Sequence, residues 1–127
     1  MEDTQKEGQL LLDTIVEAME DIKAEEIVAL DMRNLEDSVT DYFVICHGNS
    51  TTQVGAIGHR IIELCKEKLG ERPWRKEGFT NNEWVCVDFV NIVAHIFLRE
   101  RREFYRLEDL WSDAERTEYA ADRTTVN

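Results

Sequence analysis

The sequence predicts an α/β fold in which helices flank a mixed β-sheet. Apolar residues recur at helical spacing over residues 4–23 and again over 51–68. Two continuous apolar runs between these segments, 27–32 and 42–46, are typical of strands that are covered on both faces. A further pair of apolar runs within 84–98 is separated by only two residues, which indicates a hairpin.

The first half of the chain carries clear signals for the ends of its helices. The spacing T-x-x-E at 4–7 resembles a capping box, so the first helix is expected to begin there and to end near residue 23. After the second strand, "HGNST" turns the chain into the next helix, with Asn49 or Ser50 as the N-cap. Gly70 is expected to end that helix.

The hairpin fixes which side chains lie opposite each other. If residues 90–91 form a two-residue turn, strands 84–89 and 92–98 pair in an antiparallel register. Trp84 then lies opposite Phe97. One face of the hairpin becomes wholly apolar, as expected of a core.

The second face of the hairpin is mixed, and it is the first candidate for a functional surface. Its residues are Trp84, Cys86, Asp88, Val93, His95 and Phe97. An Asp and a His among large aromatic rings suit a surface left open for a partner, because aromatic residues dominate binding hot spots. The alternative is that a helix or the C-terminal segment covers this face.

The last helix is expected over 100–111 and carries two stripes of side chains. The apolar stripe, expected to pack on the sheet, is Phe104, Leu107 and Trp111. The basic stripe is expected to pair with neighbouring acids, with contact to a partner as the alternative; it consists of Arg99, Arg102 and Arg106. Tyr105 lies between the stripes, at the rim of the mixed face. From Asp113 onward there is little to bury, so we expect one α/β domain over 1–112 and a flexible tail over 113–127.

Charge points to a basic partner. The 127 residues carry a net charge of −12, and residues 1–26 alone hold nine acids and two bases. Nucleic-acid binding rests on clusters of Lys and Arg, so little or no direct nucleic-acid binding is expected. A basic protein partner fits better, because opposite surface potentials steer association. The alternative is that the charge only keeps the chain soluble.

Cysteine usage and the first residues indicate a cytoplasmic protein. The three cysteines lie far apart in apolar runs, as free thiols do in a reducing compartment. The start, "MEDTQKEG", has no signal-peptide character, and the longest apolar runs are too short to cross a membrane.

Enzymatic chemistry finds weak support in the sequence. The loop 47–50, "HGNS", precedes a helix where a phosphate could rest, and a nucleotide-binding or nucleotidyltransferase-like enzyme using this loop is the alternative function. Such an enzyme needs paired carboxylates, but the residue two after Asp88 is Val90. Cys86 and His95, opposite each other in the hairpin, are a conceivable nucleophile and base without a third group. We expect no catalytic residues, no metal and no cofactor.

Several segments together resemble the ribosomal silencing factor family, also called Iojap-like proteins. They are "IVALDM", "SVTDYFVICHGNSTTQV", "EG", "WVCVDF", "IVAHIF" and "REFYRLEDLW". The resemblance covers roughly residues 9–113 and implies a core similar to that of nucleotidyltransferases but without catalytic carboxylates. One departure concerns the hairpin turn, where the family's usual Gly-Asp is replaced by Val90-Asn91.

The resemblance implies a function in translation. Family members bind large-subunit ribosomal protein fourteen, a basic protein, and block joining of the ribosomal subunits when nutrients are scarce. They are often dimers when free. The residues expected to contact the partner are Trp84, Asp88, His95, Phe97 and Tyr105. A third interpretation is a dimeric scaffold in which the aromatic face is buried against a second copy.

Overall fold

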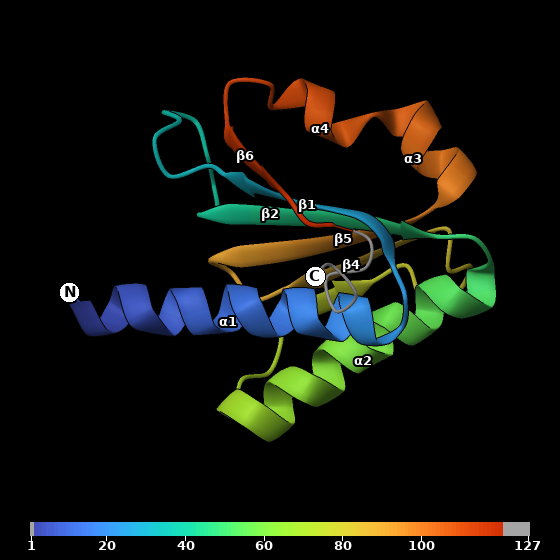
Figure 1. The fold of residues 1–127 in the computed structure, drawn as a ribbon, viewed down its shortest axis with the longest axis horizontal. Coiled ribbons are helices and arrows are strands. Elements are labelled where there is room, and N and C mark those ends of the chain that lie inside the picture. Colours follow the sequence, from blue (N-terminus) through green and yellow to red (C-terminus); the bar gives the residue numbers. More distant parts are fainter. Residues whose placement is uncertain (1, 121–127) are drawn as a thin grey trace.

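A six-stranded mixed sheet forms the centre of the protein (Figure 1). The computed structural model describes residues 2–120, with side chains from residue 5 onward. In chain order the strands are β1 (Glu25–Asp31), β2 (Tyr42–Gly48), β3 (Arg75–Glu77), β4 (Trp84–Asp88), β5 (Ile92–Leu98) and β6 (Glu115–Glu118). Their order in the sheet is β3-β4-β5-β2-β1-β6. Among these strands β2 and β5 pair in parallel and the other neighbours antiparallel, which confirms the predicted mixed sheet.

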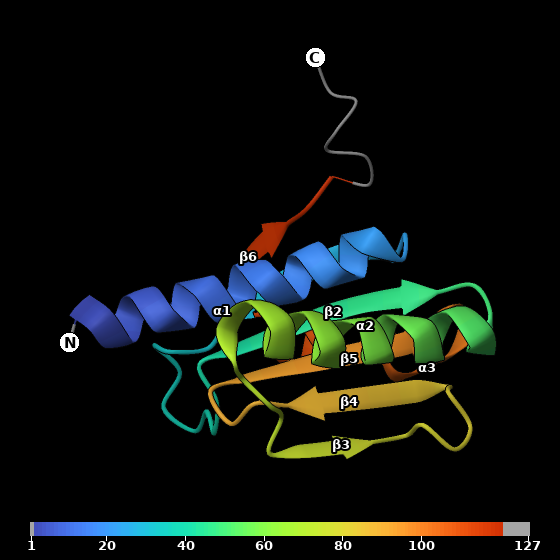
Figure 2. The same cartoon turned by 90° about the horizontal axis from the view of Figure 1, so that it is seen from below.

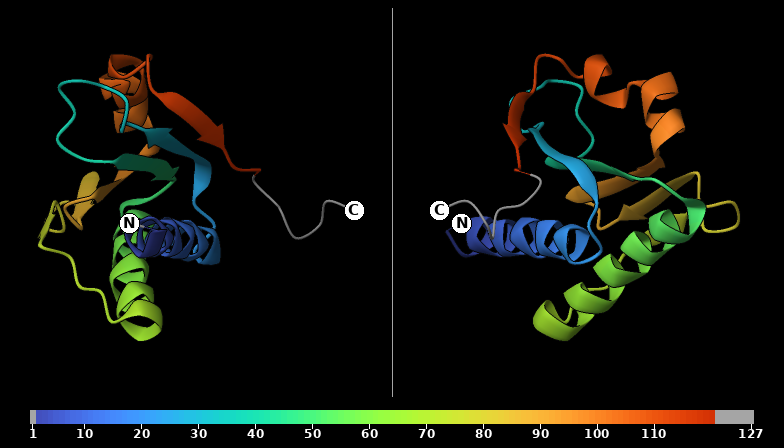
Figure 3. Two further views of the ribbon diagram at one scale, coloured as in Figure 1. Left: turned by 90° about the vertical axis from the view of Figure 1, so that its left-hand side faces the viewer. Right: turned by 45° about the vertical axis from the view of Figure 1, so that its right-hand side comes forward.

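Helices cover both faces of the sheet (Figures 1 and 3). On one face lie α1 (Glu2–Asp21) and α2 (Thr51–Leu69), which pack against each other. On the other lie α3 (Arg99–Tyr105) and α4 (Leu107–Leu110). Figure 2 shows α1 and α2 across the sheet, with β3 and β6 at its two edges. Within the described part of the chain, no helix combines the length and apolarity that a membrane crossing requires.

The main core lies between the sheet and α1–α2. Its most buried members include Leu12, Ile15, Met19, Ile57, Ile61, Val85, Val87 and Ile96. The predicted register of the hairpin is confirmed, because Trp84 pairs with Phe97 and the amide of Phe89 donates to the carbonyl of Ile92 at 2.9 Å. Because side chains alternate along a strand, this register directs the wholly apolar face of the hairpin into the core.

The ends of α2 follow from its capping residues. The hydroxyl of Ser50 accepts a hydrogen bond from the amide of Gln53, as an N-cap does. Gly70 takes a left-handed conformation, with φ 67°, and its amide donates to the carbonyl of Lys66. Such a glycine ends a helix without steric cost, so both predicted boundaries are confirmed. The predicted capping box of α1 includes Thr4, whose side chain lies outside the described residues.

The prediction of one continuous last helix is wrong. The chain bends at Arg106, which has φ 48° and separates α3 from α4. Leu107 and Trp111 pack on the sheet as predicted. Phe104 does not, because its side chain lies before the bend and is 74% exposed.

The prediction of a flexible tail from Asp113 is wrong for the residues that form β6. Backbone pairing of β6 with β1, Val28 opposite Glu118 and Asp31 opposite Glu115, adds a strand at the sheet edge. All four side chains of β6 are exposed, so no apolar pattern marked the strand in the sequence. Residues 121–127 of the predicted tail lie outside the described residues.

The hairpin turn contains a strained residue. Val90 has φ 78°, a conformation that L-residues with a branched Cβ rarely adopt. Its side chain is 54% exposed, so little burial offsets this strain. The amide of Val90 donates to the carboxylate of Asp88 at 2.7 Å, and its carbonyl accepts from the hydroxyl of Thr40 at 3.1 Å. These contacts hold the turn in place.

Replacing Val90 with Gly is therefore expected to stabilise the protein by about 1 kcal/mol, because glycine removes the clash of Cβ in a left-handed conformation. Thermal unfolding should show a rise of a few degrees in the melting temperature. Val39→Gly is the matched control: this valine is 91% exposed and is not among the residues with positive φ, so its replacement should not stabilise the chain. Equal effects of the two substitutions would contradict strain at Val90.

Candidate functional site

Four aromatic rings form a ladder from the core to the solvent. Trp84 packs on Phe97 with ring centroids 4.8 Å apart, and Tyr105 packs on Trp84 at the same 4.8 Å. Phe104 meets Tyr105 edge-on at 5.1 Å. Exposure rises along this series, from 0% at Phe97 to 44% at Tyr105 and 74% at Phe104. We call these four residues the aromatic ladder.

The sheet register and α3 bring the aromatic ladder together. Trp84 and Phe97 are cross-strand partners at the end of the hairpin remote from its turn. Tyr105 is the last residue of α3, which follows β5 directly. The indole N–H of Trp84 donates to Nδ1 of His95 at 3.1 Å, which fixes the tilt of the indole ring. The outer rings therefore rest on a rigid base.

Part of the same sheet face is covered. Trp111 and Leu107 pack over the face near β1 and β2, where Phe43 meets Trp111 at a centroid distance of 6.0 Å. Over β4 the face stays accessible, and a cleft of about 310 Å³ lies beside Trp84 and Tyr105. Its polar lining is Thr80, Asn81, Glu83 and Arg101. A helix thus covers one half of the mixed face and leaves the half around Trp84 open.

Of the five residues predicted to contact a partner, the structure groups four and separates one. Phe97 is fully buried and His95 is 7% exposed, so neither offers contact area to a partner in this structure. This corrects the expectation of direct contact, since both side chains instead support Trp84 from below. Asp88 lies at the turn end of β4, where its carboxylate approaches Arg75 at 3.8 Å. Trp84 and Tyr105 remain at the surface.

Sequence reasoning missed Phe104 as a surface residue. Its spacing from Leu107 and Trp111 is that of a buried helix stripe, but the bend at Arg106 separates it from them. The only warning in the sequence was that Tyr105, its neighbour, was expected at the rim of the mixed face.

The Cys86–His95 pair does not have the properties of a nucleophile and its base. Sγ of Cys86 lies 3.7 Å from Nδ1 of His95, the atom that already accepts from Trp84. Burial raises the pKa of the Cys86 thiol to about 11 and lowers the pKa of His95 to about 4. An activated thiolate needs the opposite shifts. Both groups are neutral packing partners near pH 7.

The polar groups of loop 47–50 are engaged within the protein. Ser50 caps α2, and the side-chain amide of Asn49 donates to the Glu25 carboxylate at 2.8 Å. The side chain of Gln53 accepts a hydrogen bond from the backbone amide of Asn49 and donates to the backbone carbonyls of Ile22 and Lys23. These bonds favour a structural role for the loop. Over the described residues, no group of three or more His, Cys, Asp or Glu side chains is placed to hold a metal ion.

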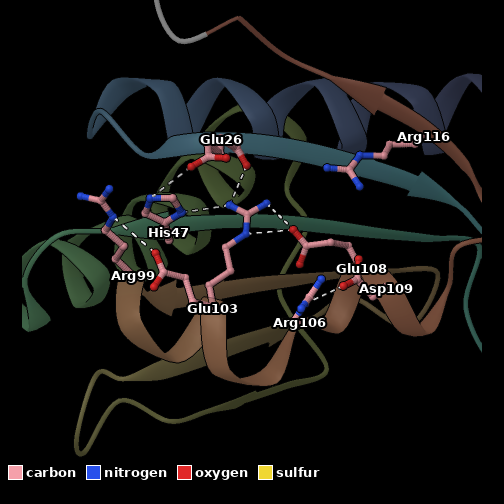
Figure 4. Close-up of a pocket in the computed structure, with 9 residues that line it drawn as sticks. Glu26, His47, Arg99, Glu103, Arg106, Glu108, Asp109 and Arg116 are labelled. Carbon is pink, nitrogen blue, oxygen red and sulfur yellow. Dashed lines mark hydrogen bonds and ion pairs between the residues drawn. The ribbon is translucent and has the colours of Figure 1, made fainter.

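A second cleft, of about 430 Å³, lies between β1, β6 and α3–α4 (Figure 4). Its lining mixes basic and acidic side chains: Glu26, His47, Arg99, Arg102, Glu103, Arg106, Glu108, Asp109 and Arg116. The arginines pair with nearby acids, as predicted for the basic stripe: Arg106 with Asp109 at 2.7 Å and Arg99 with Glu103 at 3.9 Å. We call this the charged cleft.

Arg102 forms the floor of the charged cleft together with His47. Arg102 is 7% exposed, and its Nη1 donates to Nδ1 of His47 at 3.1 Å. Because a guanidinium only donates, neutral His47 carries its proton on Nε2. Burial and the neighbouring guanidinium lower the pKa of His47. The pair is therefore one cation beside a neutral imidazole.

The fold and the ladder define a mixed α/β protein with an exposed aromatic surface of the kind that binds another macromolecule. A family model described as "Ribosomal silencing factor during starvation" matches residues 4–127. The ribosomal silencing factor RsfS of Halalkalibacterium halodurans is 42% identical over 107 residues, which cover 84% of this chain and 90% of that protein. The RsfS of Bacillus subtilis is 45% identical over 97 residues, which cover 76% and 80%.

Solved structures agree with this relationship. The crystal structure of a protein from Chromobacterium violaceum superposes on this chain with a TM-score of 0.78 and 34% sequence identity. The match covers 82% of this chain and 85% of that protein. The chain belongs to the ribosomal silencing factor family. This confirms the resemblance found in the sequence.

The buried His95 predicts a pH dependence of stability. Its pKa is lowered from 6.5 to about 4 by burial, so between these values the unfolded chain binds more protons than the folded chain. Stability due to His95 is therefore complete above pH 6.5 and is lost as the pH falls toward 4. Relative to His95→Gln, the wild-type protein should lose roughly 2–3 kcal/mol of unfolding free energy across this window.

Urea unfolding of both proteins at several pH values within the window measures this difference. Changes due to carboxylates and to His47 are common to both and cancel. Identical pH slopes in the two proteins would contradict a buried, neutral His95.

Proposed function

We propose that this chain silences ribosomes by binding large-subunit ribosomal protein fourteen and thereby preventing the small subunit from joining. Translation is repressed in this way under nutrient limitation, in the cytoplasm. The observation that carries the proposal is the aromatic ladder, whose outer rings are exposed while its inner rings are locked into the core. The relatives are named ribosomal silencing factors, which makes the ribosome the partner to test first.

The ladder has the features of a binding anchor. Trp and Tyr are enriched among hot-spot residues because large, rigid rings bury much area at little cost in conformational entropy. Here Trp84 and Tyr105 are held from below, and Phe104 extends the surface into solvent. Because these side chains are already ordered in the free protein, binding costs little further conformational entropy, which favours affinity.

Charge supports a basic partner. The net charge of −12 attracts a basic ribosomal protein and disfavours unspecific contact with RNA. On the ribosome, the proposed mechanism is steric: the bound domain, with acidic α1 on the far side of its sheet, fills space that the small subunit needs. No chemical step is required. Family membership further implies that the free chain is a dimer, which sedimentation would test.

Phe104→Ala gives the cleanest test, because the side chain is 74% exposed and its loss should leave the fold unchanged. We expect affinity for isolated large ribosomal subunits to fall about tenfold or more, and Trp84→Ala to cost on the order of 2 kcal/mol or more of binding. Fluorescence titration of the labelled chain against large subunits, with small subunits alongside, measures both effects.

Trp74→Ala is the matched control. Trp74 is 68% exposed, but it lies outside the aromatic ladder, where Arg75 stacks on its ring at 5.0 Å. Its replacement should not change affinity. Equal losses for Phe104→Ala and Trp74→Ala would refute the ladder as the site. Absence of saturable binding to large subunits, with thermal stabilisation by a nucleotide and divalent metal, would instead favour the enzyme that uses loop 47–50.

A further inference from the structure

Arg102 connects four elements through one buried guanidinium. Its Nε and Nη2 donate to Oε2 of Glu108 in α4, at 3.0 and 2.8 Å. Its Nη1 donates to the carbonyl of Glu26 in β1 at 2.7 Å and to His47 in β2 at 3.1 Å. Figure 4 shows Glu26, His47 and Glu108 among the residues that line the charged cleft. Arg102 itself belongs to α3, so the side chain ties α3 to α4 and both to the sheet.

This connection reaches one residue with a strained backbone, Glu26, and spans a second, Arg106. Glu26 has φ 49° at an irregularity of β1, between Glu25 and Val28, where the register with β2 shifts. Arg106 has φ 48° at the bend between α3 and α4. Non-glycine residues keep such conformations only where surrounding contacts hold them. The fork from Arg102 to Glu108 spans the bend, and the bond to the Glu26 carbonyl fixes the bend relative to the sheet.

The placement of α3 on the sheet determines where the outer rings of the aromatic ladder point. Tyr105 directly precedes Arg106, and the amide of Arg106 donates to the carbonyl of Arg102 at 2.9 Å. Arg102 lies three residues before Tyr105 in α3, so the hydrogen bond from its guanidinium to the Glu26 carbonyl fixes α3, and with it Tyr105 and Phe104, relative to the sheet. The contact of Tyr105 with Trp84, at 4.8 Å, therefore depends on where Arg102 holds α3.

We propose that Arg102 is a positioning residue for the partner-binding surface: by tying α3 to the sheet and to α4 it holds Tyr105 and Phe104 against Trp84 in the geometry that binds. The predicted effect of Arg102 on ribosome binding rests on the proposed function. The predicted effect of Arg102 on the geometry of the aromatic ladder in the free protein does not. The side chains of Arg102 and Glu108 are only 8% and 13% exposed, so they would act on the partner through Tyr105 and Phe104 and not by direct contact. In this proposal the charged cleft has a structural role, the positioning of the aromatic ladder, and binds no ligand.

The chemistry of arginine explains why another cation would not serve. Two N–H groups converge on one carboxylate oxygen, Oε2 of Glu108, while a third nitrogen reaches the sheet, and this needs the planar arrangement of donors in a guanidinium. Lysine keeps the charge but offers a single nitrogen. Arg102→Lys therefore removes the geometry and leaves the charge, which separates positioning from electrostatics.

The experiment compares Arg102→Lys with two reference variants. Tyr105→Ala shows the spectrum of a ladder that has lost its third ring. Ile61→Val, at a fully buried position of α2 on the other face of the sheet, controls for a general loss of stability. Glu108→Gln keeps the size of the acceptor but not its charge, and it serves as the test if Arg102→Lys does not fold.

Two readouts are measured for each variant. The first is the indole N–H resonance of Trp84 in the free protein, assigned with Trp84→Phe, because this resonance senses the ring of Tyr105. The second is affinity for large ribosomal subunits. For Arg102→Lys we expect the resonance to move toward its position in Tyr105→Ala and the affinity to fall at least tenfold. Glu108→Gln should shift the resonance in the same direction by less, and Ile61→Val should leave both readouts unchanged.

The outcomes distinguish this inference from the proposed function. If the Trp84 resonance of Arg102→Lys stays at the wild-type position, the positioning role is overturned, independently of the result for ribosome binding. Glu108→Gln decides in the same way if Arg102→Lys is unfolded. An affinity loss no greater than that of Ile61→Val also overturns it. If the wild-type chain does not bind large subunits, the proposed function fails, and the resonance still decides whether Arg102 positions the ladder.

Discussion

The parallel pairing of β2 with β5 is the constraint on which the rest of the structure depends. Parallel neighbours cannot be joined by a tight turn, so the chain between them must cross over one face of the sheet. Here that crossover contains α2, which with α1 commits one face to the main core. The opposite face is left for α3–α4 and for the aromatic ladder. The division of the protein into a supporting face and a working face follows from this one pairing.

The same pairing joins the two notable features of the working face. In its register His47 lies beside Phe97, and Ile45 lies beside His95. Paired residues of neighbouring strands point to the same side of a sheet, so the imidazole that accepts from Arg102 and the innermost ring of the ladder are direct neighbours. The charged cleft and the aromatic ladder are thus adjacent parts of one surface. Because of this adjacency, Arg102 is connected to the aromatic ladder through the neighbouring side chains of His47 and Phe97.

What the sequence predicted is what local patterns encode. The ends of α2 follow from Ser50 and Gly70, and the register of the hairpin follows from the alternation of side chains around a two-residue turn. The family could also be recognised, because its motifs are spread over most of the chain. Trp84 and Tyr105 were identified as surface aromatics from their positions in these patterns.

What the sequence did not predict depends on contacts between distant segments. The bend at Arg106 is held by hydrogen bonds from Arg102 to α4 and to the carbonyl of Glu26, and no local pattern encodes these. Without the bend, Phe104 has the spacing of a core residue, which is why it was placed inside. β6 forms through backbone groups, and its four exposed side chains carry no periodic signal. The burial of Phe97 beneath Trp84 likewise depends on packing between separate segments, which the sequence pattern does not encode.

The composition of β6 has a consequence for how copies of this chain can meet. In the part of the chain that the structure describes, β6 is the outermost strand beyond β1, and its sequence is Glu-Arg-Thr-Glu. Open strand edges invite the same edge of another molecule. If two copies aligned β6 antiparallel over its full length, Glu115 of each would face Glu118 of the other, and like charges directly opposite are unfavourable. The β6 edge thus disfavours extension of the sheet by a second copy in this register.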